Sequence, residues 1–125
     1  MIEEGDRLFG DRLTTAVTLI ARRFILSLPS EIREAAEDVL IVTRLRPDSE
    51  EDDDLLGLFE GPTRGELAAG ASEIPPRITL FAENLWQEAD EDLETLEEEV
   101  EVTLFHEIGH YIGLDEEDLE ARDLA

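Results

Sequence analysis

The sequence predicts an α+β fold in which an N-terminal helix and a small three-stranded sheet pack against a C-terminal helix. Three observations support this prediction. Apolar residues recur at helical spacing over residues 11–28, three short apolar stretches between residues 39 and 82 suit strands, and a second helical pattern covers residues 90–113. A chain of 125 residues can bury a modest core, so we expect one domain over residues 1–125.

The first predicted helix spans residues 11–28. Its apolar side chains follow the spacing of a stripe that faces a core: Leu13, Ala16, Val17, Ile20, Phe24 and Leu28. Asp11 is the expected N-cap and Pro29 the expected stop. Ser30 is expected to cap a short second helix that runs to about Glu37. Such a stripe predicts a helix that covers the sheet, because a sheet needs one face buried.

Three apolar stretches are the predicted strands. The run from Val39 to Val42 is continuous and β-branched, which predicts a strand covered on both faces. The other strands are expected at residues 55–60 and 78–82. Gly57 lies inside the former, and a glycine there often marks the close approach of another backbone.

The segments between the strands are predicted to be loops. Residues 47–54 are mostly acidic and suit a solvated loop, and residues 61–77 are rich in Gly and Pro. Arg64 and Arg77 near the ends of the second loop are the only cations expected over a cleft. Asn84 is expected to begin a turn.

The helix predicted over residues 90–113 carries the residues with chemical potential. His106 and His110 are about 40° apart around a helix axis, so their imidazoles project from one face. Two neutral imidazoles so placed can share one Zn²⁺. Glu107 lies about 100° from His106 around the helix axis. From there its carboxylate can accept a proton from a water near the metal without being a ligand. This is the His-Glu-x-x-His arrangement of zinc hydrolases.

The flanks of this motif strengthen the prediction. Leu104, Ile108 and Tyr111 fall on the face opposite the histidines, which predicts a buried helix. Gly113 can end the helix in a left-handed turn, after which Glu116 is the first candidate for a third metal ligand. Three neighbouring acids compete for that role: Asp115, Glu117 and Asp118. The alternative is a buried helix whose histidines are merely hydrogen-bonded.

From His106 to Glu116 the chain reads HEIGHYIGLDE, which resembles the active-site helix of the minigluzincins, small zincin-like bacterial metallopeptidases. Further stretches recur in that family in the same order: Phe24–Pro29 with Glu31 and Ile32, Asp38–Val42, Leu55–Gly61 and Arg77–Phe81. The resemblance covers residues 24–119. Its most specific part is the helical motif, although Asp is commoner than Glu in the family at the position of Glu116.

The resemblance implies a minimal zincin fold with a mixed sheet. In that fold the strand at residues 78–82 lies in the middle, parallel to residues 39–45 and antiparallel to residues 55–60. In zincins generally an edge strand pairs with an extended peptide substrate, and residues 55–60 are our candidate for that edge, the alternative being an ordinary strand of the sheet. The activity implied is hydrolysis of a peptide or protein, with Zn²⁺ held by His106, His110 and Glu116, and with Glu107 as the catalytic base. The rival hypotheses are a non-catalytic metal-binding scaffold and an acidic interaction module.

The net charge of −24 limits the partners. All ten basic residues are arginine, and such an acidic surface repels nucleic-acid phosphates and anionic lipids. We therefore expect neither nucleic acid nor membrane as a partner, whereas the oligomeric state stays open. The chain has no cysteine, its first residues lack the pattern of a signal peptide, and no apolar run is long enough to span a membrane. A cytoplasmic location is the resulting expectation.

Overall fold

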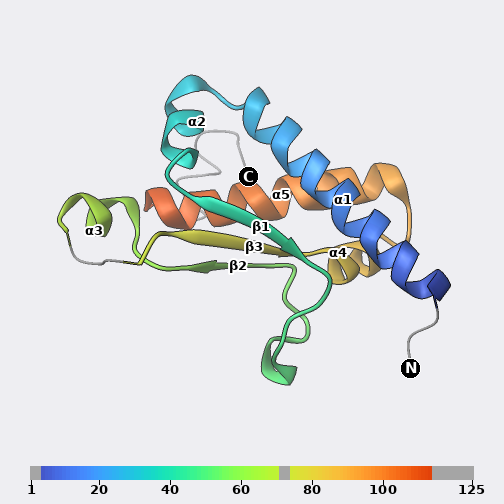
Figure 1. Ribbon diagram of the computed structural model, residues 1–125. Helices are drawn as coiled ribbons and strands as arrows, with labels where there is room; N and C mark the ends of the chain where they lie inside the picture. The colour runs from blue at the N-terminus through green and yellow to red at the C-terminus, as the bar shows by residue number, and fades with distance from the viewer. Residues whose placement is uncertain (1–3, 71–73, 114–125) are drawn as a thin grey trace.

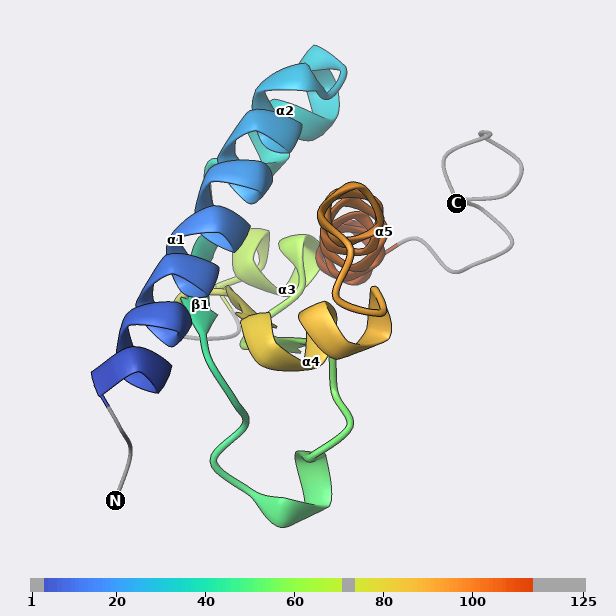
Figure 2. The same ribbon diagram turned by 90° about the vertical axis from the view of Figure 1, so that its right-hand side faces the viewer.

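In the computed structural model, residues 4–70 and 74–113 are described, with the side chains of residues 4–7 excepted. Two long helices lie on one side of a three-stranded sheet, and the loop that holds a short 3₁₀ turn projects from the other side (Figures 1 and 2). In chain order the elements are α1 (Glu4–Ser27), α2 (Ser30–Ala36), β1 (Leu40–Arg44), the 3₁₀ turn η1 (Glu50–Asp52), β2 (Gly57–Glu60), α3 (Arg64–Ala68), β3 (Arg77–Phe81), α4 (Ala82–Glu88) and α5 (Leu93–Ile112).

The central strand of the sheet is β3. It pairs in parallel with β1 and antiparallel with β2, which gives the order β1-β3-β2 and confirms the predicted arrangement. Within β3, Ile78 and Leu80 are fully buried beneath the helices, as a strand with neighbours on both sides should be. Strand β2 is therefore an edge of the sheet, with one side free of any described strand.

The prediction that the first strand is covered on both faces is wrong. Leu40 is 54% exposed, and the rest of β1 is only half-buried or exposed. The reason is its place in the sheet: β1 is the other edge strand, and the described helices α1 and α5 cover a single face (Figure 2). A continuous apolar run does not distinguish these two environments.

The core lies between the sheet and the two long helices. From the predicted stripe, Leu13, Val17 and Leu28 are buried, while the remaining members are partly covered. The rings of Phe24 on α1 and Phe105 on α5 meet edge to face with centroids 6.3 Å apart. Each fully buried aliphatic side chain contributes about 1.5–3 kcal/mol to the free energy of folding, so this stripe holds α1 against α5.

Within the described residues, the helices are all too short or too polar to cross a membrane.

Two predicted helix starts are wrong. Because α1 spans Glu4–Ser27, Asp11 lies inside the helix and is not its N-cap. The additional turns bring Phe9 against Trp86 of α4, with ring centroids 6.2 Å apart, and this tertiary contact favours helix before the predicted start. The N-cap of α2 is Pro29, which makes no side-chain cap hydrogen bond, and Ser30 is the first helical residue.

Two short helices replace predicted loop and turn. In the segment 61–77, α3 begins with a reciprocal capping box between Thr63 and Glu66, a pattern that is visible in the sequence as Thr-x-x-Glu. Asn84 lies inside α4, and its side-chain Nδ2 donates to the backbone oxygens of Asp53 and Leu55 at 2.7 Å each. These bonds tie α4 to the segment that leads into β2.

The last predicted helix begins later than expected, at Leu93 and not at residue 90. Asp90 and Glu91 both have left-handed backbone, with φ of 53° and 58°, and they separate α4 from α5. Left-handed backbone is higher in free energy for a residue with a β-carbon than for glycine. An Asp-Glu pair is therefore not a usual sequence signal for such a turn, and the sequence pattern did not indicate it.

Candidate metal centre

The helix that carries both histidines has a well-defined start and end. At its start, the Asp92 carboxylate accepts a hydrogen bond from the backbone N–H of Thr95 at 2.9 Å, and this bond holds the pKa of Asp92 below its usual value. At its end, Gly113 has φ of 89° and donates its N–H to the carbonyl oxygen of Gly109 at 3.0 Å. The predicted left-handed stop at Gly113 is confirmed.

The two faces of α5 have opposite environments. Leu104, Ile108 and Tyr111 are buried in the core, as predicted. On the other side, His106 is half-buried and His110 is exposed. The packed face holds the helix in place, so the histidines project from a rigid element.

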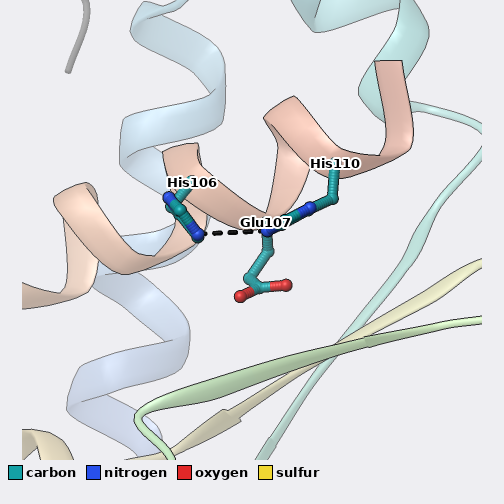
Figure 3. A group of neighbouring side chains, drawn as sticks. All are labelled: His106, Glu107 and His110. Carbon is teal, nitrogen blue, oxygen red and sulfur yellow. Dashed lines mark hydrogen bonds between the residues drawn. The ribbon is translucent and has the colours of Figure 1, made fainter. Parts of the chain in front are cut away.

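The three polar side chains of the motif gather at one point (Figure 3). The Nε2 atoms of His106 and His110 are 3.0 Å apart, and their rings meet edge to face with centroids 4.6 Å apart. A carboxylate oxygen of Glu107 lies with these nitrogens, all three ligand atoms being within 4.8 Å of one another. The structure thus brings together every described residue that the sequence predicted for the site.

The donor set fits zinc. Two nitrogens that each lie about 2.0–2.1 Å from a tetrahedral ion are about 3.3 Å apart, so the observed pair needs to open by only a few tenths of an ångström. Imidazole nitrogen is also a preferred zinc donor. Glu116, the predicted third ligand, lies outside the described residues, as do its competitors.

Strand β2 runs beside the motif. A β-carbon built on Gly57 would lie 2.8 Å from Cγ2 of Thr103 and 3.5 Å from Cγ of Glu107. Further along, the ring of Phe59 packs against that of Tyr111, with centroids 6.1 Å apart. The sequence predicted that another backbone approaches Gly57, but its closest neighbour is a side chain of the motif helix. Thr103 had no part in the sequence prediction, and only its position one turn before the motif could have indicated it.

The predicted cations do not both lie near the histidines. Arg77 donates from Nη2 to Oε1 of Glu60 at 2.8 Å, on the sheet face opposite the helices, because its neighbour Ile78 faces the core. That part of the prediction is wrong. Arg64 lies exposed on α3.

Tyr111 is buried, as predicted, and its hydroxyl has no hydrogen-bond partner among the described residues. Burial raises the pKa of this phenol, the nearby Asp38 carboxylate raises it further, and the Arg64 guanidinium opposes them. Since its side chain is buried in the core, Tyr111 does not line the histidine side of the helix.

A helix that presents two histidines and a glutamate in His-Glu-x-x-His spacing, beside the edge strand of a small mixed sheet, defines the zincin class of metal-dependent hydrolases. Residues 34–125 match the family described as zincin-like metallopeptidase. The chain belongs to this family, and its fold is a minimal form of the zincin fold. The family implies a metal cofactor, typically zinc. No curated protein matches the sequence.

Proposed function

We propose that the protein is a zinc-dependent peptidase that hydrolyses peptide bonds. The observation that carries this proposal is the 3.0 Å separation of the His106 and His110 Nε2 atoms, with the Glu107 carboxylate beside them. His106 and His110, together with Glu116, would hold the ion. When bound, zinc supplies a nucleophilic water at neutral pH and polarises a carbonyl group.

Glu107 is the proposed general base. Its carboxylate shares the site with both histidines, and its half-buried position limits competing contacts with solvent. It accepts the proton that the attacking water loses and later delivers it to the leaving amine. Proton transfer by a positioned side chain is typically worth about 10²–10⁴-fold in rate.

The free edge of β2 is the proposed binding site for the peptide. Leu56 accepts a hydrogen bond from the N–H of Phe81, and the register places Leu58 opposite Thr79. Because bonding alternates along an antiparallel pair, Leu56 and Leu58 bond to β3, whereas the backbone groups of Gly57 and Phe59 face outward. An extended peptide can add to these groups as a further strand, and it would then lie next to Glu107.

Metal analysis combined with an unbiased peptide-library cleavage assay tests the proposal. We expect about one equivalent of zinc, cleavage of a subset of peptides, and loss of cleavage in Glu107→Gln protein that keeps its zinc. The charge of −24 favours neutral or basic peptides over acidic ones. Zinc-loaded wild type that cleaves no peptide would contradict the proposal.

A second candidate is a metal-binding scaffold without catalysis. The observation in its favour is that neither Tyr111, which is buried, nor Arg77, which lies on the far face of the sheet, is placed to donate to a developing oxyanion. Zinc without cleavage supports the scaffold. Tight binding of a basic protein in the absence of zinc supports an acidic interaction module instead.

A further inference from the structure

We propose that Gly57 positions the substrate: because it has no side chain, strand β2 lies close enough to α5 for a peptide on the strand's free edge to reach Glu107. This inference rests on the proposed function and deepens it, since it assigns a role to a residue outside the His-Glu-x-x-His motif. It concerns positioning, because Gly57 itself performs no proton transfer.

The space between Gly57 of β2 and Thr103 of α5 is too narrow for a β-carbon at residue 57. A β-carbon at Gly57 would lie 2.8 Å from Cγ2 of Thr103, closer than carbon atoms can pack, and 3.4 Å from the backbone oxygen of Thr79. Thr103 is buried, and its methyl group is attached directly to the helix β-carbon, where few rotamers are open. The methyl group can leave this position only if the Thr103 side chain changes its χ1 rotamer, and otherwise strand β2 must move away from the helix. We infer that an added side chain at residue 57 displaces the strand.

The same displacement would act on the substrate site. The position of that added β-carbon is 3.5 Å from Cγ of Glu107, so Gly57 lies on the side of β2 that faces the proposed base. The N–H and C=O groups of Gly57 face the free edge of β2, where they would hydrogen-bond the peptide. If β2 moves outward, the bound peptide moves away from Glu107, and a misplacement of about 1 Å can cost on the order of 10²-fold in rate.

A matched set of variants separates positioning from ordinary packing. Gly57→Ala adds one methyl group at the contact, and Thr103→Ser removes the methyl group that it would strike while keeping the hydroxyl. The double variant therefore carries the new side chain without the collision. Gly65→Ala is the control, because a β-carbon at Gly65 meets no atom within 4 Å.

Four quantities are measured for each protein: the thermal midpoint without metal, the zinc dissociation constant, kcat and KM on the best peptide from the library. Gly57→Ala should lower the thermal midpoint, leave zinc affinity within about twofold, and lower kcat by tenfold or more, on the order of the cost of misplacement. The double variant should recover most of the thermal midpoint and most of kcat. Gly65→Ala should match wild type in kcat, KM and zinc affinity.

The results that overturn the inference differ from those that overturn the proposed function. Active wild type with an equally active Gly57→Ala variant rejects the positioning role and leaves the peptidase proposal intact. Recovery of the thermal midpoint without recovery of kcat in the double variant also rejects it. Wild type that cleaves no peptide rejects the proposed function and the positioning role together. If Gly57→Ala alone does not fold, the double variant is compared with wild type, and a loss of kcat in the folded double variant rejects the inference.

Discussion

The Nε2 atoms of His106 and His110 lie 3.0 Å apart on successive turns of α5. This distance is close to the separation of two nitrogens that bind the same metal ion. The arrangement arises from the helix itself, because residues four apart project from one face, and from the core contacts of the opposite face. Little rearrangement is therefore needed for the pair to bind zinc.

Replacing both histidines should remove zinc and leave the fold intact. The double variant His106→Ala and His110→Ala loses both imidazole ligands, while Leu104 and Ile108 keep the helix packed in the core. Metal analysis and circular dichroism measure the two effects. Val102→Ala, at an exposed position of the same helix, is the control that should keep its zinc. Equal zinc content in the double variant and in wild type would exclude this site.

Glu107 and Glu116 should respond differently to replacement by glutamine. Glu107→Gln keeps the shape but cannot accept a proton, so zinc should stay bound while turnover falls by about 10²–10⁴-fold. Glu116→Gln replaces a charged ligand with a poorly coordinating amide, so zinc affinity itself should fall. Isothermal titration with zinc and steady-state kinetics measure the two effects. If Glu107→Gln releases the metal while Glu116→Gln retains it, the proposed roles are wrong.

Two leucines on α5 should differ in their contribution to stability. Leu104 is 0% exposed and Leu93 is 69% exposed, so the same change to alanine creates a cavity only at Leu104. Leu104→Ala should lower the free energy of unfolding by about 2–5 kcal/mol, and Leu93→Ala by no more than about 0.5 kcal/mol. Urea denaturation provides the values. Similar losses in both variants would contradict the packing of this helix.

Asp92 should stabilise the start of α5 in a pH-dependent way. The hydrogen bond from Thr95 lowers the pKa of Asp92 in the folded state. The charged form therefore contributes stability above the unfolded pKa of about 3.9, and this contribution is lost as the pH falls through the lower folded pKa. Asp92→Ala should lower the thermal midpoint at pH 7. Asp92→Asn should keep a cap but lose this acid dependence, which thermal melts between pH 2 and about pH 6 can follow.

Tyr111 should contribute to the stability of the fold through its ring and little through its hydroxyl. The hydroxyl has no partner among the described residues, so Tyr111→Phe should change the free energy of unfolding by less than about 1 kcal/mol. Tyr111→Ala should cost about 3–5 kcal/mol, because the ring is fully buried against Phe59. A large loss in the Phe variant would show that the hydroxyl has a partner.

Alkaline pH offers a second measurement on Tyr111. Its folded pKa is raised by burial, so the neutral phenol contributes stability that is complete below the unfolded pKa of about 10. That contribution is lost as the pH rises from there through the folded pKa. Thermal melts of Tyr111→Phe protein should lack this component of the alkaline loss. Identical profiles for the variant and wild type would indicate that the phenol is not buried.

Local patterns were sufficient to predict the motif helix. The spacing of His106, Glu107 and His110, the apolar face opposite them and the stop at Gly113 all depend on residues within a few turns of one another. The core stripe of α1 follows from the same periodicity. Two short helices were not predicted, because α3 and α4 are too short for a periodic signal, and α4 is held by the Asn84 hydrogen bonds to a distant loop.

The sequence by itself determined which residues of α5 lie at the candidate metal centre and which face the core, because helical geometry couples spacing to direction. Only the tertiary structure decided what lies beside them. Strand order made β2 the edge next to Glu107, and the packing of the helices on the Ile78 side of the sheet left Arg77 on the opposite face. The contact between Gly57 and Thr103 depends on how closely a strand and a helix pack, and no spacing along the chain encodes that distance.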